Sequence, residues 1–228
     1  MSPDGQKILG FLQDVAAHRA AHVADSALAE RVRAVKAHQH ARFEATYADL
    51  LASPRYGPAA RFFLNDLYGP HDFAARDGQF ARIVPALVRL FPKDIVRTVL
   101  ALAELHALSE ELDSLMATAL DGQTLDTQSY AQAWRKVGRP QDREQQIQLM
   151  LSVGLALDGF TRKPLLRHSL RLMRGPASAA GLGALQRFLE TGFDTFREMR
   201  GPQVLLDSIS QRERALAAAL FSGADTAD

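Results

Sequence analysis

Hydrophobic residues recur along most of the chain three or four positions apart, which is the spacing of an α-helix, and strand-like alternation is almost absent. Residues with high helix propensity dominate from end to end. No stretch between the periodic segments is long enough to serve as a linker between domains. We therefore predict an all-α protein, with residues 1–228 forming a single-domain bundle of about nine or ten helices.

Glycine–proline pairs mark the expected helix boundaries, because glycine can end a helix and proline can begin the next one. The tetrapeptide MRGP occurs at 173–176 and again at 199–202, and it predicts a stop at both places. Asp25 or Ser26 is a suitable cap for the second helix. The N-terminal helix could lie at the periphery, and residues 223–228 are expected to be a disordered tail. The predicted helices span 5–23, 26–52, 58–68, 73–90 with a break or kink near Pro85, 95–115, 127–137, 140–160, 164–174, 177–200 and 203–221.

The segment Ile95–Leu105 is apolar nearly all round, which is typical of a helix at the centre of a bundle. The uncharged stretch 145–157 is too short to cross a bilayer, which needs about 20 apolar residues. The N-terminus has the pattern of an amphipathic helix and lacks that of an export signal. We expect a soluble cytoplasmic protein without a membrane partner.

Composition narrows the possible chemistry. The chain has no cysteine, which excludes disulfides, thiolate metal sites and cysteine nucleophiles and suits a reducing compartment. Its 27 basic and 26 acidic residues nearly cancel, so a nucleic-acid partner would have to bind through a local patch.

The densest motif is RFFLNDLYGPHDF at 61–73. Its apolar residues predict a short core helix, and two interpretations of its polar residues remain open. They could cap and brace helix ends, or they could hold an anionic or polar ligand in a small cavity. The candidate ligand-binding residues are Arg61, Asn65, Asp66, Tyr68, Asp72 and Arg76.

Two long segments, TYADLLASPRYGPAARFFLNDLYGPHDF and RLMRGPASAAGLGALQRFLETGFDTFREM, resemble a family of uncharacterised bacterial proteins. The resemblance runs from about Arg31 to Phe221, and FFLNDLYGP is its most specific part. It implies a helical protein of the bacterial cytoplasm. It supplies no activity and no functional residues.

Known catalytic and nucleotide-binding motifs are absent, and GLGALQ at 181–186 lacks the third glycine of a dinucleotide fingerprint. His18 and His22 lie one helical turn apart, as do His40 and Glu44, but two ligands do not complete a structural metal site. His106 is interpreted as a hydrogen-bonded core histidine, with haem ligation as the alternative. We predict no metal, no cofactor and no catalytic residue.

A basic stripe gives the main local charge asymmetry. Lys163, Arg167, Arg171 and Arg174 recur at helical spacing, whereas residues 91–126 are mostly acidic among their charged positions. The two segments could face each other or solvate their surfaces. The alternative is a phosphate-contacting face for nucleic acid.

Three functional hypotheses follow. The preferred one is a non-enzymatic helical binding or interaction module, with a protein partner, a homodimer or an unidentified small molecule as its ligand. The second is a helical enzyme or carrier that uses a metal or cofactor. The least favoured is nucleic-acid binding through 163–174.

Overall fold

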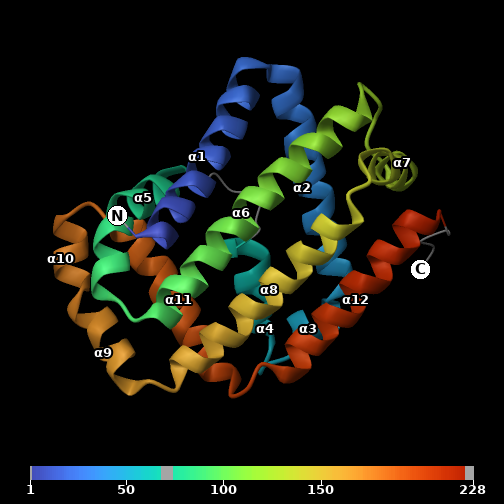
Figure 1. Ribbon diagram of the computed structural model, residues 1–228. Helices are drawn as coiled ribbons and strands as arrows, with labels where there is room; N and C mark the ends of the chain where they lie inside the picture. Colours follow the sequence, from blue (N-terminus) through green and yellow to red (C-terminus); the bar gives the residue numbers. More distant parts are fainter. Residues whose placement is uncertain (1, 68–73, 224–228) are drawn as a thin grey trace.

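The computed structural model describes residues 2–67 and 74–223 (Figure 1). The described residues form twelve α-helices and one π-helical segment, and no strand occurs among them. The predicted all-α fold is confirmed, as a single helical domain. The helices are α1 (Pro3–Ala24), α2 (Ser26–Thr46), α3 (Ala48–Ala52), α4 (Gly57–Phe62), α5 (Ala74–Leu90), α6 (Lys93–Leu120), α7 (Thr127–Val137), α8 (Pro140–Thr161), α9 (Pro164–Leu172), α10 (Arg174–Ala179), α11 (Gly183–Met199) and α12 (Gln203–Ser222), and the π-helix η1 is Phe63–Leu67.

Helix α6 lies at the centre of the bundle, as its apolar sequence predicts. It packs against α1, α2, α7 and α8 (Figure 1). The residues that it buries include Val96, Leu112 and Met116. Helix α1 docks onto α5 and α6 through the buried Ile8 and Val15, so it is part of the bundle.

The second predicted helix, 26–52, is in fact two helices. The chain turns at Tyr47, which ends α2 and precedes α3. Its ring lies 4.3 Å from that of Phe43, and its hydroxyl donates a hydrogen bond to Glu213 at 2.8 Å. Burial of a tyrosine requires a partner for its hydroxyl, and this requirement is met only through α12. The Asp25 cap is confirmed, since its carboxylate accepts from the Leu28 amide at 3.0 Å.

The two MRGP copies do not behave alike. At the first copy the predicted stop and restart occur two residues earlier than expected, because α9 ends at Leu172, the chain turns at Met173, and α10 begins at Arg174 with Pro176 in its first turn. Proline is tolerated there because the first-turn amides have no partner within the helix. Gly181, with φ of 69°, follows the end of α10 instead, so the predicted helix 177–200 is interrupted before α11. At the second copy α11 ends at Met199, as predicted, and Arg200 takes the left-handed conformation.

Pro85 lies inside α5, where the sequence predicted a break or kink. Residues 68–73, which include the glycine–proline pair at 69–70, lie outside the described residues, as does the expected tail apart from Gly223.

Candidate functional site

A cavity of about 180 Å³ lies inside the bundle, between α6 and α8 on one side and α2, η1, α5 and α11 on the other. Most of its wall is apolar, and six phenylalanine, tyrosine and tryptophan side chains of the described residues line it. Two groups of polar residues also reach it, one near α7 and α12 and the other near α5. The aromatic lining residues other than Tyr130 and His106 are Phe43, Phe63, Phe80, Trp134 and Phe188.

Arg143 is the most unusual residue in this wall. It lies in the first turns of α8, is only 4% exposed, and places its guanidinium 3.8 Å from the centre of the Trp134 ring. Its Nη1 donates to the side-chain oxygen of Gln146 at 3.3 Å, and Gln146 in turn donates to Ser109 at 2.8 Å. Among residues 2–67 and 74–223, no carboxylate lies within 4 Å of its nitrogens.

Unpartnered hydrogen-bond donors gather at this end of the cavity. Within the described part of the chain, five buried side-chain nitrogens have no hydrogen-bond partner, and four of them belong to cavity-lining residues. These four are Nε and Nη2 of Arg143, Nε of Arg42 and Nε1 of Trp134. A buried polar group without a partner costs about 1–3 kcal/mol, more if it is charged. Such a concentration calls for a physical explanation.

Arg42 lines the same end but has an internal counter-charge. Its Nη1 lies 2.6 Å from a carboxylate oxygen of Glu213, and the same oxygen accepts from Tyr47. Burial alone would lower the pKa of Arg42, but the Glu213 carboxylate outweighs it and the pKa is raised. Burial, reinforced by Glu213, raises the pKa of Tyr47. Both groups therefore keep their protons at neutral pH.

Tyr130 lines the same end of the cavity as these arginines and is buried. Its burial raises its pKa, although the positive charges of Arg143 and Arg42 act in the opposite direction. Behind it, the buried Gln39 donates to Asp113 at 3.2 Å. The amine of Lys36 lies 3.9 Å from Asp113 and 2.7 Å from Glu110. The acids behind the wall thus already have donors.

The α5 end of the cavity is an internally satisfied ion cluster. Asp77 lies 2.9 Å from Arg19 and 2.8 Å from His106, and it is also in contact with Arg76. Burial opposes ionisation of Asp77, but His106 and the two arginines outweigh it and lower its pKa. The hydrogen-bonded core position expected for His106 is what the structure shows. No group here lacks a partner in the way that Arg143 does.

The structure separates the residues that the 61–73 motif suggested as a ligand site. Arg76 lines the cavity and donates to the backbone oxygen of Asp66 at 2.5 Å. Arg61 is exposed and donates to the Leu51 carbonyl at 2.9 Å, whereas Asn65 is hydrogen-bonded to His40 at 3.2 Å. Asn65 lies within the π-helix η1, where the side-chain spacing differs from that of the α-helix predicted over 58–68, so it does not follow Arg61 on one face as an α-helix would place it.

The apolar part of the same motif is core, as one of the two interpretations proposed. Phe62, Phe63 and Leu64 are all buried, and Phe63 and Leu64 also reach the cavity. Tyr68 and Asp72 lie outside the described residues. Binding by the polar residues of the motif stays a prediction.

The basic stripe is largely neutralised by acidic neighbours. Lys163 lies 2.6 Å from Asp94, which is the facing arrangement that the charge pattern suggested. Arg167 pairs with Asp194 and Arg174 with Glu190, both across to α11. Arg171 is exposed.

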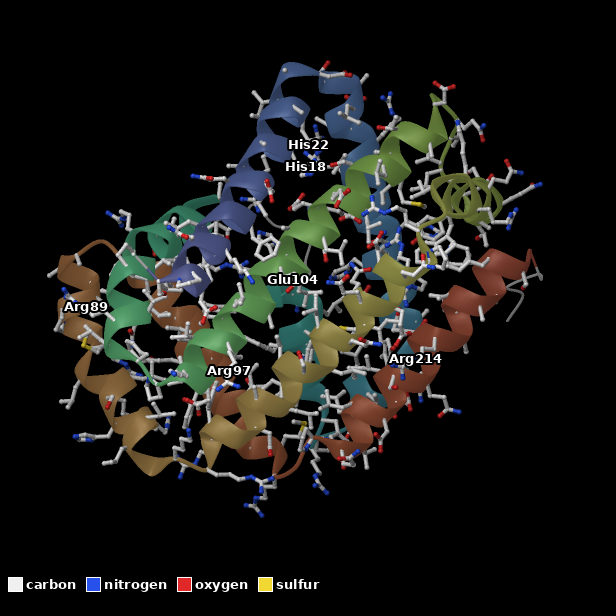
Figure 2. The ribbon with its side chains drawn as sticks, in the orientation of Figure 1. His18, His22, Arg89, Arg97, Glu104 and Arg214 are labelled. Atoms are coloured by element: carbon white, nitrogen blue, oxygen red, sulfur yellow. The ribbon has the colours of Figure 1, made fainter. Side chains whose placement is uncertain are left out.

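The histidine pairs contact other side chains. His18 and His22 lie on α1 (Figure 2), and His22 is 2.9 Å from the hydroxyl of Ser114. His40 lies 3.7 Å from Glu44. A search of the described residues finds no group of three or more potential metal ligands.

Sequence reasoning missed the residues that matter most in the cavity. Arg143, Ile147 and Met150 all line it, and they are spaced one helical turn apart along α8. An arginine at the start of an apolar stripe can be recognised in the sequence as a candidate buried charge. A charged residue on a buried face needs a partner. The partner's absence could be seen only in three dimensions.

In the described part of the chain, no helix is long and apolar enough to cross a membrane. A sequence profile described as a domain of unknown function (DUF8198) matches residues 18–227, a range that contains both segments of the family resemblance. No curated protein and no solved structure shows a significant match to the chain.

Proposed function

We propose that this chain, which belongs to the DUF8198 family, is a non-enzymatic binding protein that holds a small molecule in the cavity between α6 and α8. The bacterial cytoplasm is the compartment that the family resemblance and the lack of cysteine favour.

The observation that carries this proposal is the combination of a mostly apolar cavity with unpartnered donors in its wall. Small-molecule sites are concave and largely apolar, with a few polar groups that fix the ligand's orientation. Protein interiors are otherwise close-packed, with few voids larger than a water molecule. A cavity of about 180 Å³ is therefore a departure from ordinary packing. It exceeds the ~150 Å³ at which an apolar cavity can hold benzene.

The test uses the single tryptophan of the chain as its reporter. Trp134 is 7% exposed and lines the cavity, so a ligand placed there should change its emission. Titration with benzyl alcohol as a neutral probe should give a saturable change in fluorescence. Native mass spectrometry of freshly purified protein checks in addition for an added mass.

Filling the cavity supplies the decisive variant. Ala103 is buried in α6 and faces the cavity, so Ala103→Leu should reduce the affinity for benzyl alcohol by about tenfold or more by occupying the space. Ala101→Leu is the matched control, because Ala101 lies on the same helix but not in the cavity wall. Equal binding by both folded variants, or no saturable binding by the unmodified protein, would contradict the proposal.

A further inference from the structure

We infer that the ligand is a monocarboxylate with a small apolar body, and that Arg143 holds its carboxylate at the α7 end of the cavity. This inference rests on the proposed function, because it names the class of molecule that the same cavity binds. It goes further in assigning one residue as the anchor and one charge to the ligand.

The first support is the geometry of the guanidinium. Nη1 of Arg143 is engaged by Gln146, whereas the two nitrogens without a partner are Nε and Nη2. These two lie along one edge of the guanidinium plane. Their parallel N–H groups match the two oxygens of a single carboxylate, which is the bidentate arrangement that arginine forms most readily. The cation–π contact with Trp134, 3.8 Å from the guanidinium carbon to the ring centre, holds the guanidinium in the cavity wall.

The second support is the balance of charges in the cavity wall. Among the described residues, the cavity lining has three arginines, Arg42, Arg76 and Arg143, and two acids, Asp77 and Glu213. Glu213 pairs with Arg42, and Asp77 contacts Arg76. Arg143 is the arginine left over. Burying a charge is costly unless it is paired, so one negative charge from a ligand would complete the site.

The third support is that all the unpartnered groups are donors. Nε1 of Trp134 and Nε of Arg42 line the same cavity, and no buried side-chain acceptor among the described residues lacks a partner. A molecule that brings only acceptors suits such a wall. A carboxylate does so with one charge. A phosphate would bring a second charge, for which the wall has no further unpaired arginine.

The rest of the wall specifies the apolar body. Beyond Arg143 and Gln146 along α8 come Ile147 and Met150, and they face the aromatic residues of η1 and α11. A cavity of about 180 Å³ accommodates a single ring or a short branched chain. Benzoate is therefore the probe that combines the inferred anion with a body of suitable size.

The experiment compares benzoate, benzyl alcohol and phenylphosphonate in titrations of the full chain at pH 7, followed by Trp134 fluorescence and calorimetry. These probes share a ring and differ in charge. The unmodified protein should bind benzoate about tenfold or more tightly than benzyl alcohol, since hydrogen bonds to a charged group are stronger than those to a neutral one. Phenylphosphonate should bind more weakly than benzoate.

Three variants assign the preference to Arg143. Arg143→Met should bind benzoate and benzyl alcohol about equally, because it keeps an unbranched apolar side chain without the charge. Arg143→Lys should retain only part of the preference, because an ammonium group cannot form the two parallel bonds. Arg167→Met is the matched control and should behave like the unmodified protein. Arg167 also has a buried unpartnered Nε, but it pairs with Asp194 away from the cavity.

The outcomes separate this inference from the proposed function. Equal affinity for benzoate and benzyl alcohol in the unmodified protein would overturn the carboxylate assignment and leave a neutral-ligand cavity standing. Tighter binding of phenylphosphonate would overturn it in favour of a phosphate-bearing ligand. A benzoate preference that survives in Arg143→Met would show that another residue is the anchor. If no probe binds and Ala103→Leu changes nothing, the donors are satisfied by water, and both proposals fail.

Discussion

Two arginines reach the same end of the cavity, and they differ in whether a carboxylate pairs with them. Arg42, on α2, is paired with Glu213 of α12 at 2.6 Å, and Tyr47 shares the same carboxylate oxygen. Arg143, on α8, is more deeply buried, stacks on Trp134 and has no carboxylate within 4 Å in the described part of the chain.

The contrast distinguishes a structural ion pair from a group prepared for a ligand. The Arg42 cluster ties α2 and the turn at Tyr47 to α12, and removing Glu213 takes away the acceptor that Arg42 and Tyr47 share. The Arg143 guanidinium holds two unpartnered donors in place at a cost in free energy. A protein that selection had optimised only for stability would not keep such a group, whereas binding sites commonly do so at the expense of stability.

The largest effect should come from breaking the Arg42 cluster. We expect Glu213→Leu to lower the free energy of unfolding by about 3 kcal/mol, because Arg42 and the Tyr47 hydroxyl lose their common acceptor. This is the lower end of the range for buried pairs, because the Arg42 side chain remains 24% exposed. Urea unfolding followed by circular dichroism measures it.

Glu144→Leu is the control for that experiment. Glu144 also pairs with α12, through the partly exposed Arg214 that Figure 2 labels, at 2.7 Å. An exposed pair contributes no more than about 1 kcal/mol. Similar losses in both variants would mean that Glu213 is an ordinary surface partner and that the contrast with Arg143 is unfounded.

The sequence predicted the architecture better than the site, for a physical reason. The 3.6-residue period and the Asp25 cap depend on neighbours in the chain, and both correctly indicated helices. The sequence also predicted which helix lies at the centre of the bundle, because Ile95–Leu105 is apolar nearly all round.

Errors arose where a distant contact decides the local structure. The break at Tyr47 depends on Glu213, which is 166 residues away, and within the π-helix Asn65 does not follow Arg61 on one face as an α-helix would place it. Arg143 stands out because no carboxylate of the described residues pairs with it. Periodicity placed Arg143 within a predicted helix but could not reveal a missing partner.

A smaller effect is expected when the unpartnered arginine itself is replaced. Arg143→Met in the ligand-free protein should change the free energy of unfolding by no more than about 1 kcal/mol, because relief of the two unpartnered donors offsets the lost stack on Trp134. The same urea experiment measures it beside Glu213→Leu. A loss as large as that of Glu213→Leu would make Arg143 a structural residue and remove the basis for its role as an anchor.

The smallest predicted effect concerns His38, whose ring lies 4.4 Å from that of Tyr130, a cavity-lining residue near the two arginines. Burial lowers the pKa of His38, the positive charge of Arg42 adds to this, and Asp126 opposes it. The folded state thus favours the neutral ring. Its contribution to stability is complete above the unfolded value of about 6.5 and is lost as the pH falls through 6.5 towards the lowered value.

His38→Phe keeps the ring contact with Tyr130 and removes the titration. We expect the loss of unfolding free energy between pH 7.5 and 5.5 to be smaller in this variant by a few tenths of a kcal/mol, since His38 is only half-buried. His168→Gln, at an exposed position on α9, is the matched control for replacing a histidine. If His38→Phe loses as much stability on acidification as the unmodified protein, then neither burial nor the charge of Arg42 lowers the pKa of His38 enough to affect stability. The positive charges at this end of the cavity would then act on Tyr130 without reaching the histidine packed against it.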